Sequence, residues 1–177
     1  IRRQTQLYAS EFGWDGTFEA MLAEIAGKFV AKFDAKSDNC WIAERNGEIV
    51  GSVFLVRAGK ANGQLRMLYV EPAARGLGIG QRLVQECIED ARRKGYRKLM
   101  LWTNDILVAA RRIYERKGFV KVSEERHHSF GHDLVGQPAR TEFVGAVGEF
   151  EVDERALAVH LGGDQPVGRR LPDRDRA

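Results

Sequence analysis

Residues 68–88 read LYVEPAARGLGIGQRLVQECI, and this stretch decides how the rest of the chain is interpreted. It passes from an apolar, strand-like run through a glycine-rich loop into apolar residues at helical spacing, which predict a helix over 80–94. Gly76, Gly78 and Gly80 let the backbone adopt unusual φ values and approach a ligand closely. Because free N–H groups gather where a helix begins, the loop is a candidate site for a phosphate or another anion.

Two common phosphate-binding loops do not match this spacing. A P-loop ends in Lys followed by Ser or Thr, and no such pair follows the glycines here. A dinucleotide-binding loop has the spacing G-x-G-x-x-G in a parallel βαβ unit, whereas these glycines follow G-x-G-x-G after strands expected to be antiparallel. A glycine-rich turn without any ligand is the alternative that the loop alone leaves open.

Outward from the loop, hydrophobic periodicity predicts the order α-α-β-β-β-α-β-α-β. Asn46-Gly47 favours a type I′ hairpin turn, because both central residues of that turn need positive φ. A further strand is expected to begin within 133–136, and 141–152 is another candidate strand. The other expected elements are helices 2–12 and 17–33, two strands within 40–57, strand 64–70, helix 80–94, strand 98–103, helix 106–117 and strand 119–128.

Residues 68–88 resemble the acetyl-CoA signature of the GNAT superfamily of N-acetyltransferases. The family's strand, proline and R/Q-x-x-G-x-G/A pattern fall on Leu68, Val70, Pro72, Arg75, Gly78 and Gly80. A second family signature is matched by AARRIYERKGF, with Ala110, Ile113, Tyr114, Gly118 and Phe119. The resemblance covers residues 2–137 and implies an α/β (α+β) fold. That fold has a mixed, mostly antiparallel central sheet flanked by helices, in the order α-α-β-β-β-α-β-α-β(-β).

The resemblance implies an acetyl-CoA-dependent N-acetyltransferase, an acyltransferase that moves an acetyl group to a primary amine by direct transfer in a ternary complex. Loop amides would bind the pyrophosphate of coenzyme A, and the backbone of 68–70 would pair with its pantetheine arm. Leu107 is a departure, because the family often has a cofactor-contacting Asn at this position, seven residues before the tyrosine; Asn104, three residues earlier, is the candidate substitute. The implied cofactor-binding residues are Leu68, Tyr69, Val70, Arg75, Gly76, Leu77, Gly78, Ile79, Gly80, Asn104, Ala110 and Tyr114.

Acetyl transfer also needs an acid for the leaving thiolate and a base for the amine. Tyr114 matches the family's tyrosine near the sulfur and is the predicted general acid, with a core aromatic as the alternative. Some family members use a carboxylate on the strand before the loop, but residues 64–70 contain none. Glu71, Asp105 and His128 are therefore the candidate bases, and a chain of water molecules is another.

Three histidines, His127, His128 and His132, lie close together in the sequence. Without acidic partners at a defined spacing they are a weak metal signal, so no metal site is predicted. One of them is expected to point into the acceptor pocket, where it would act as a base or orient the substrate. Glu11 and Trp14 are candidates for the other side of that pocket, with simple packing as the alternative for Trp14.

Composition limits the class of protein. The charge of +3 is small and mixed along the chain, and no basic stripe with interleaved aromatics is present, so no nucleic-acid binding is predicted. No apolar run reaches the length of a membrane span. Cys40 and Cys87 show no CxxC or zinc-ligand spacing and fit a reducing, cytoplasmic location. The expected partner is a small amine or a peptide amino group, and a homodimer is left open.

The composition changes near residue 137. Residues 138–177 contain arginine but no lysine and are richer in glycine and proline. The interpretation is a GNAT acetyltransferase domain over 1–137 and an atypical C-terminal extension over 138–177, with disorder expected over 162–177. A genuine extension and a shifted reading frame both account for this composition. Because the chain begins at Ile1, a further family strand is expected upstream, and a fused winged-helix regulator would also lie there.

Two other functions compete with catalysis. A non-catalytic acyl-CoA-binding sensor module, coupled to a regulatory domain, would need the loop but no base. A nucleotide-binding protein would rest on the loop alone, and competition between acetyl-CoA and ATP for binding would separate it.

Overall fold

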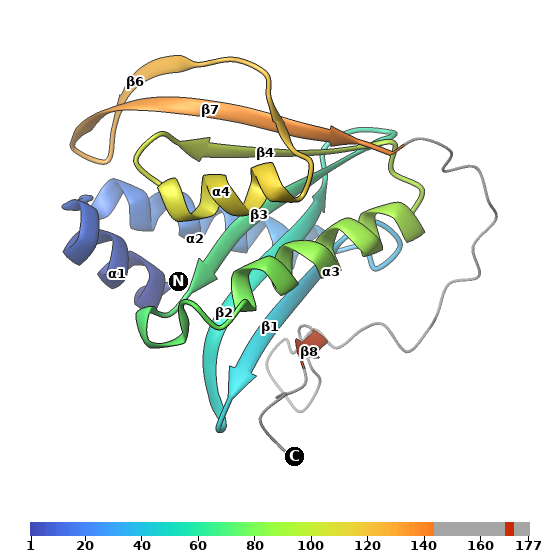
Figure 1. The fold of residues 1–177 in the computed structure, drawn as a ribbon, viewed down its shortest axis with the longest axis horizontal. Helices are drawn as coiled ribbons and strands as arrows, with labels where there is room; N and C mark the ends of the chain where they lie inside the picture. Colours follow the sequence, from blue (N-terminus) through green and yellow to red (C-terminus); the bar gives the residue numbers. More distant parts are fainter. Residues whose placement is uncertain (144–168, 172–177) are drawn as a thin grey trace.

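The computed structural model describes residues 1–143 and 169–171. An eight-stranded sheet runs through the molecule, with helices on both of its faces (Figure 1). The strands lie in the order β5-β7-β4-β3-β2-β1-β8, and β6 pairs with β7. Their bounds are β1 (Asn39–Arg45), β2 (Glu48–Arg57), β3 (Asn62–Val70), β4 (Lys98–Asn104), β5 (Val120–Lys121), β6 (Glu125–Ser129), β7 (His132–Glu142) and β8 (Arg169–Leu171).

Most neighbouring strands are antiparallel. The pairs β1/β2, β2/β3, β4/β7, β5/β7 and β6/β7 are antiparallel, whereas β3/β4 and β1/β8 are parallel. Asn46 and Gly47 both have positive φ between β1 and β2, as a type I′ turn requires. The predicted fold class, a mixed and mostly antiparallel sheet flanked by helices, is confirmed.

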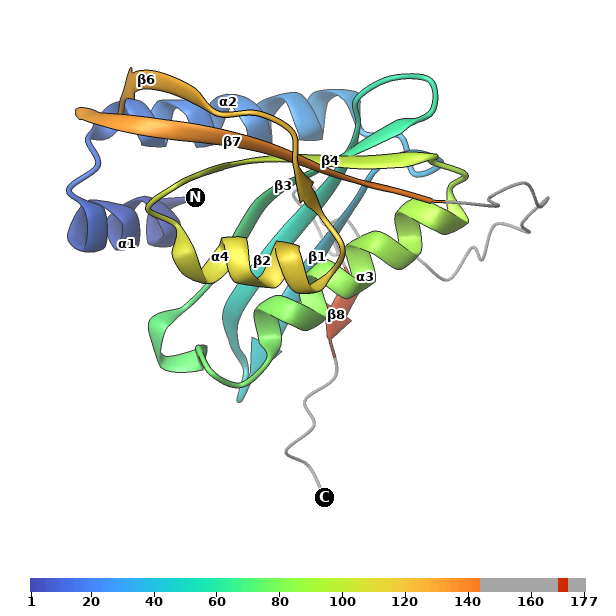
Figure 2. The same cartoon turned by 45° about the horizontal axis from the view of Figure 1, so that its top comes forward.

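The helices divide between the two faces of the sheet (Figure 2). Helices α3 (Ile79–Arg93) and α4 (Val108–Arg116) cover one face, and α2 (Gly16–Lys32) lies on the other, preceded by α1 (Arg2–Phe12). The apolar stripe predicted for α3 packs into the main core, where Leu83, Val84, Cys87 and Ala91 are completely buried. None of the described helices is long and apolar enough to cross a membrane.

Local signals explain where the first two helices end and begin. Gly13 has φ +69° and ends α1 in the left-handed conformation that glycine adopts without steric cost. The Asp15 side chain accepts a hydrogen bond from the backbone N–H of Thr17 at 2.9 Å, which caps α2.

Two expectations about the second half of the chain were wrong. The single strand predicted over 119–128 is divided into β5 and β6, because these two pair with different parts of β7 and leave residues 122–124 outside the ladder. The helix predicted from residue 106 begins at Val108, since residues 105–107 form a turn in which the Leu107 N–H donates to Asn104 O.

The end of the described chain crosses the boundary expected from composition. Strand β7 runs through residue 137 to Glu142 and pairs with β4 along that length. Within 162–177, where disorder was expected, residues 169–171 form β8 beside β1. The remaining residues of the candidate strand over 141–152 and of the expected extension lie outside the described residues.

Candidate active site

The site begins where β3 separates from β4. The two strands pair only over Asn62–Gln64 and Lys98–Met100. In the ladder with β2, one residue, Val53, faces both Met67 and Leu68, which makes a β-bulge. Met67 has φ +53° at this bulge. The rest of β3 therefore keeps β2 as its neighbour while its other edge is free of β4.

The first cavity, which we call the loop cavity, has a volume of about 490 Å³ and lies against the glycine loop and the start of α3. It is the cavity in which most of the predicted cofactor-binding residues meet. Its lining includes Leu68, Tyr69, Val70, Arg75, Gly76, Gly78, Ile79, Gly80 and Ala110. Leu77 lies in the loop but not in this lining, and its side chain is exposed.

Backbone geometry makes the loop a suitable cradle for an anion. Gly76 and Gly78 have φ +79° and +76°, and Gly78 is the N-cap of α3. The Arg82 N–H donates to Gly78 O at 3.0 Å, so the helical hydrogen bonds start there. The first N–H groups of a helix have no acceptor within it, and the helix dipole favours negative charge at that end.

Two ion pairs join α1 to the ends of this loop. Arg75 places two guanidinium nitrogens on Glu11, at 2.9 and 3.0 Å. Arg3 makes the same kind of two-bond contact with Glu71, both at 2.9 Å. Glu71 also accepts a hydrogen bond from the Tyr69 hydroxyl. The bond from Arg3 is the main reason that the pKa of Glu71 lies below its usual value.

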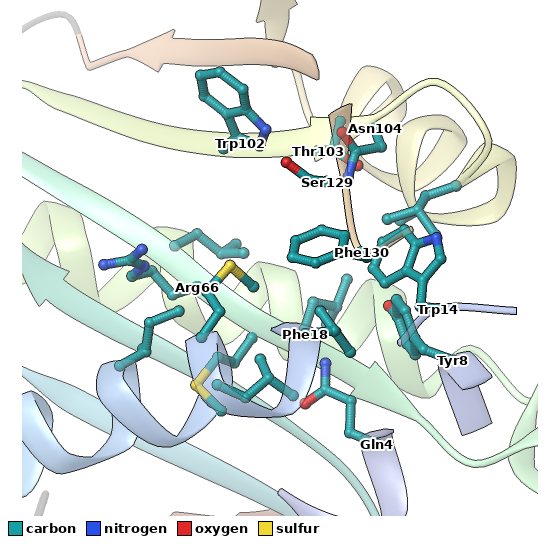
Figure 3. Close-up of a pocket in the computed structure, with 18 of the residues that line it drawn as sticks. Gln4, Tyr8, Trp14, Phe18, Arg66, Trp102, Thr103, Asn104, Ser129 and Phe130 are labelled. Atoms are coloured by element: carbon teal, nitrogen blue, oxygen red, sulfur yellow. The ribbon is translucent and has the colours of Figure 1, made fainter. Parts of the chain in front are cut away.

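The second cavity, which we call the inner cavity, has a volume of about 420 Å³ and opens between α1, α2, β3, β4 and β6 (Figure 3). Aromatic side chains form much of its wall: Trp14, Phe18 and Phe130 pack with ring centroids 4.6–5.1 Å apart. Trp14 is thus a buried packing residue and also a lining residue, and its indole N–H is buried without a hydrogen-bond partner. Glu11, the other candidate for this pocket, lines the loop cavity instead.

The two cavities meet at the gap between β3 and β4. Four residues line both of them: Tyr8, Leu68, Leu107 and Ala110. A ligand lying along the free edge of β3 would therefore reach from one cavity into the other.

Tyr114 and Asn104 line the inner cavity rather than the loop cavity. The Tyr114 ring is almost completely buried and packs against Phe119, with ring centroids 5.8 Å apart. Burial raises the pKa of the Tyr114 hydroxyl, so this group keeps its proton at neutral pH. Both sequence interpretations of Tyr114, core aromatic and site residue, describe its position.

The three base candidates do not meet in the inner cavity. Glu71 is held by Arg3 and Tyr69. Asp105 accepts a hydrogen bond from the Val135 N–H at 3.2 Å. His128 is exposed and pairs with Asp133 at 2.7 Å. None of these three lines the inner cavity. For His128 the reason is that neighbouring residues of β6 point to opposite sides, and His127 is the one that faces inward.

His127 is the functional candidate that sequence reasoning did not select. Its Nε2 lies 3.0 Å from Asn104 Oδ1, and its Nδ1 lies 2.8 Å from Ser129 Oγ. Because the amide oxygen of Asn104 can only accept, Nε2 donates to it, and the lone pair of Nδ1 accepts the hydrogen bond of the Ser129 hydroxyl. Among the described residues, no group of three His, Cys, Asp or Glu side chains is arranged to hold a metal ion.

The comparison with protein families decides the relationship. Residues 3–119 match the model of the acetyltransferase (GNAT) family. The chain belongs to this family. A relative, an uncharacterized N-acetyltransferase of Schizosaccharomyces pombe, is 33% identical over 126 residues, which cover 70% of this chain and 76% of the relative. The prediction of an N-acetyltransferase enzyme is confirmed at the level of the family.

Two further proteins are similar to this chain, one in sequence and one in fold. The probable N-acetyltransferase camello of Xenopus tropicalis is 31% identical over 134 residues, which cover 70% of this chain and 61% of that protein. A GNAT acetyltransferase of Elizabethkingia anophelis, solved with acetyl-CoA bound, shares the fold with a TM-score of 0.56. That similarity has 20% identity and covers 68% of this chain and 82% of the other.

Proposed function

We propose that this GNAT enzyme transfers an acetyl group from acetyl-CoA to a primary amine of a small molecule or peptide, by direct attack within a ternary complex. The observation that carries the proposal is the meeting of the two cavities at the free edge of β3. A thioester held in the loop cavity and an amine held in the inner cavity would be brought together there, and such placement supplies a large part of the rate.

The loop cavity suits the donor. The N–H groups at the start of α3 would hold the pyrophosphate of coenzyme A, and Arg75 would exchange Glu11 for a phosphate oxygen. The free edge of Leu68–Val70 offers backbone groups to the amides of the pantetheine arm. One backbone N–H of this edge would also stabilise the negative charge that develops on the carbonyl oxygen.

Two side chains of the inner cavity would handle protons. The neutral amine attacks the carbonyl carbon, the C–S bond breaks, and the sulfur leaves as a thiolate. Tyr114 would donate a proton to that sulfur, and its raised pKa keeps the proton in place until the thiolate lies against it. His127 would accept the proton lost by the amine at Nδ1, directly or through the Ser129 hydroxyl.

Calorimetric titration with acetyl-CoA, followed by a panel of amines with thiol release as the readout, tests the proposal. Binding with turnover is the expected result. Binding that leaves every amine unmodified would favour the non-catalytic sensor, and failure to bind acetyl-CoA would remove the donor assignment of the loop cavity.

A further inference from the structure

Arg66 is a cation at the inner cavity that makes no ion-pair contact with a carboxylate of the described residues. It lies on β3 and lines the cavity, yet none of the lining residues is an aspartate or glutamate. Among the described residues, no carboxylate is within ion-pair distance of its guanidinium, and Glu24, the acid whose charge acts on it, is ion-paired with Lys28. Arg66 is half-buried, and this burial lowers its pKa.

The acids beside Arg66 outside the cavity are also engaged. Arg66 also lines a smaller hollow, of about 340 Å³, that includes Asp34 and Asp38. Asp34 pairs with the Arg57 guanidinium at 3.2 Å, and Asp38 accepts the Arg57 backbone N–H at 2.9 Å. A partly desolvated guanidinium without a protein partner is therefore available to a ligand, and its planar fork matches a carboxylate with two parallel hydrogen bonds.

Position along β3 relates this cation to the reacting centre. Arg66 precedes Leu68, one of the four residues that line both cavities, by two positions, with the bulge residue Met67 between them. Figure 3 shows Arg66 on one side of the inner cavity and Tyr8, Trp14 and Asn104 on the other. An acceptor whose amine reaches the junction would thus extend toward Arg66.

We propose that the acceptor of this enzyme is an amine that also bears a carboxylate, and that Arg66 binds this carboxylate. The inference rests on the proposed acetyl transfer and names the class of acceptor. It covers α-amino acids and short peptides with a free C-terminal carboxylate, which differ in the spacing between the two groups.

The test uses acceptors that differ only in the carboxylate: L-phenylalanine and its amide, and glycyl-L-phenylalanine and its C-terminal amide, with phenylethylamine as a plain amine. The value of kcat/KM is measured for each acceptor by thiol release, with the wild type and with Arg66→Gln. Dividing the acid-to-amide ratio of the wild type by that of the variant cancels the difference in basicity between the two amines.

We expect this quotient to be roughly tenfold or more for at least one pair, because a hydrogen bond to a charged group contributes about 1.5–3 kcal/mol. Arg66→Lys should keep part of the preference, since it keeps the charge but loses the fork. Arg140→Gln is the matched control: it also removes an arginine charge from a strand, but Arg140 pairs with Glu142 and lines neither cavity. It should leave the ratio unchanged.

The outcomes separate this inference from the proposed function. If amides and phenylethylamine are acetylated as well as the acids, and Arg66→Gln changes nothing, acetyl transfer stands and the carboxylate inference is wrong. If acetyl-CoA binds but no acceptor is modified, the proposed function fails and the inference fails with it. Calorimetric titration of each variant with acetyl-CoA shows whether the loop cavity is intact. The affinity of each variant for acetyl-CoA should equal that of the wild type.

Discussion

Replacing Gly78 with alanine separates the role of the loop in binding from its role in folding. Gly78 has φ +76°, and an L residue in this left-handed region costs roughly 1–2 kcal/mol. A Cβ at this position would meet no heavy atom within 4 Å, so backbone strain is the cost to stability. For a chain of this size that strain lowers the melting temperature by about 2–8 °C.

Gly47 provides a control that matches Gly78 in conformation. It has φ +81°, and a Cβ there would also meet nothing within 4 Å. It lies in the turn between β1 and β2 and lines neither cavity. Gly47→Ala should therefore lower the melting temperature by a similar amount and leave ligand binding unchanged.

The two variants should differ in their affinity for acetyl-CoA. At the N-cap of α3, a methyl group would stand where the proposed pyrophosphate approaches the backbone. Loss of one hydrogen bond to a charged group corresponds to about 1.5–3 kcal/mol, or roughly a 10- to 150-fold rise in Kd. Calorimetric titration measures this rise. Equal affinities for the two variants would refute the assignment of the loop as a phosphate cradle.

Three other predictions concern Tyr114, His127 and Glu71. Tyr114→Phe keeps the packed ring but removes the proton donor, so kcat should fall about tenfold or more while the Kd of acetyl-CoA stays constant in titrations; an equal kcat would return Tyr114 to the core alone. His127→Ala should lower kcat/KM about 100-fold, whereas His128→Ala, at an exposed position, should stay near wild type in the same steady-state assay. The pKa of Glu71 is lowered mainly by the bond from Arg3. The ionised Glu71 carboxylate therefore stabilises the fold fully above about pH 4.5, and this stabilisation is lost as the pH falls through the pKa that Glu71 has in the folded protein. Glu71→Gln should therefore melt at a lower temperature than wild type at pH 7, and the difference should shrink as the pH falls below 4.5. A difference that stays constant in acid would contradict this pairing.

Local patterns were sufficient to predict much of the fold. The apolar stripe of α3, the Asn46-Gly47 turn and the glycine loop each depend on residues close together in the sequence, and each lies where it was predicted. The division between β5 and β6 was missed, because residues 119–128 were interpreted as one strand. The break depends on which part of β7 each half pairs with, and that pairing is a long-range property.

At the candidate site, too, the local sequence does not determine which side chains meet. His127 and His128 are neighbours of the same type, and only the register of β6 decides which one faces the cavity. Glu71 follows the strand before the loop, where a base was expected, but its partner Arg3 is 68 residues away in the sequence. No spacing rule could show that this carboxylate is already paired.

Met67 connects the fold to the site most directly. Strand β3 stays paired with β2 along its length but separates from β4 after Gln64. The bulge allows both, because the pairing with β2 continues on either side of it. A glycine would adopt φ +53° without strain, yet it would provide no side chain, whereas Met67 lines the inner cavity and packs against its aromatic cluster. The strained backbone and the cavity wall are therefore two properties of one residue. Because Met is not a residue that turn chemistry associates with positive φ, the local sequence does not predict the bulge, and the expectation that the backbone of 68–70 would pair with a ligand came from the family resemblance.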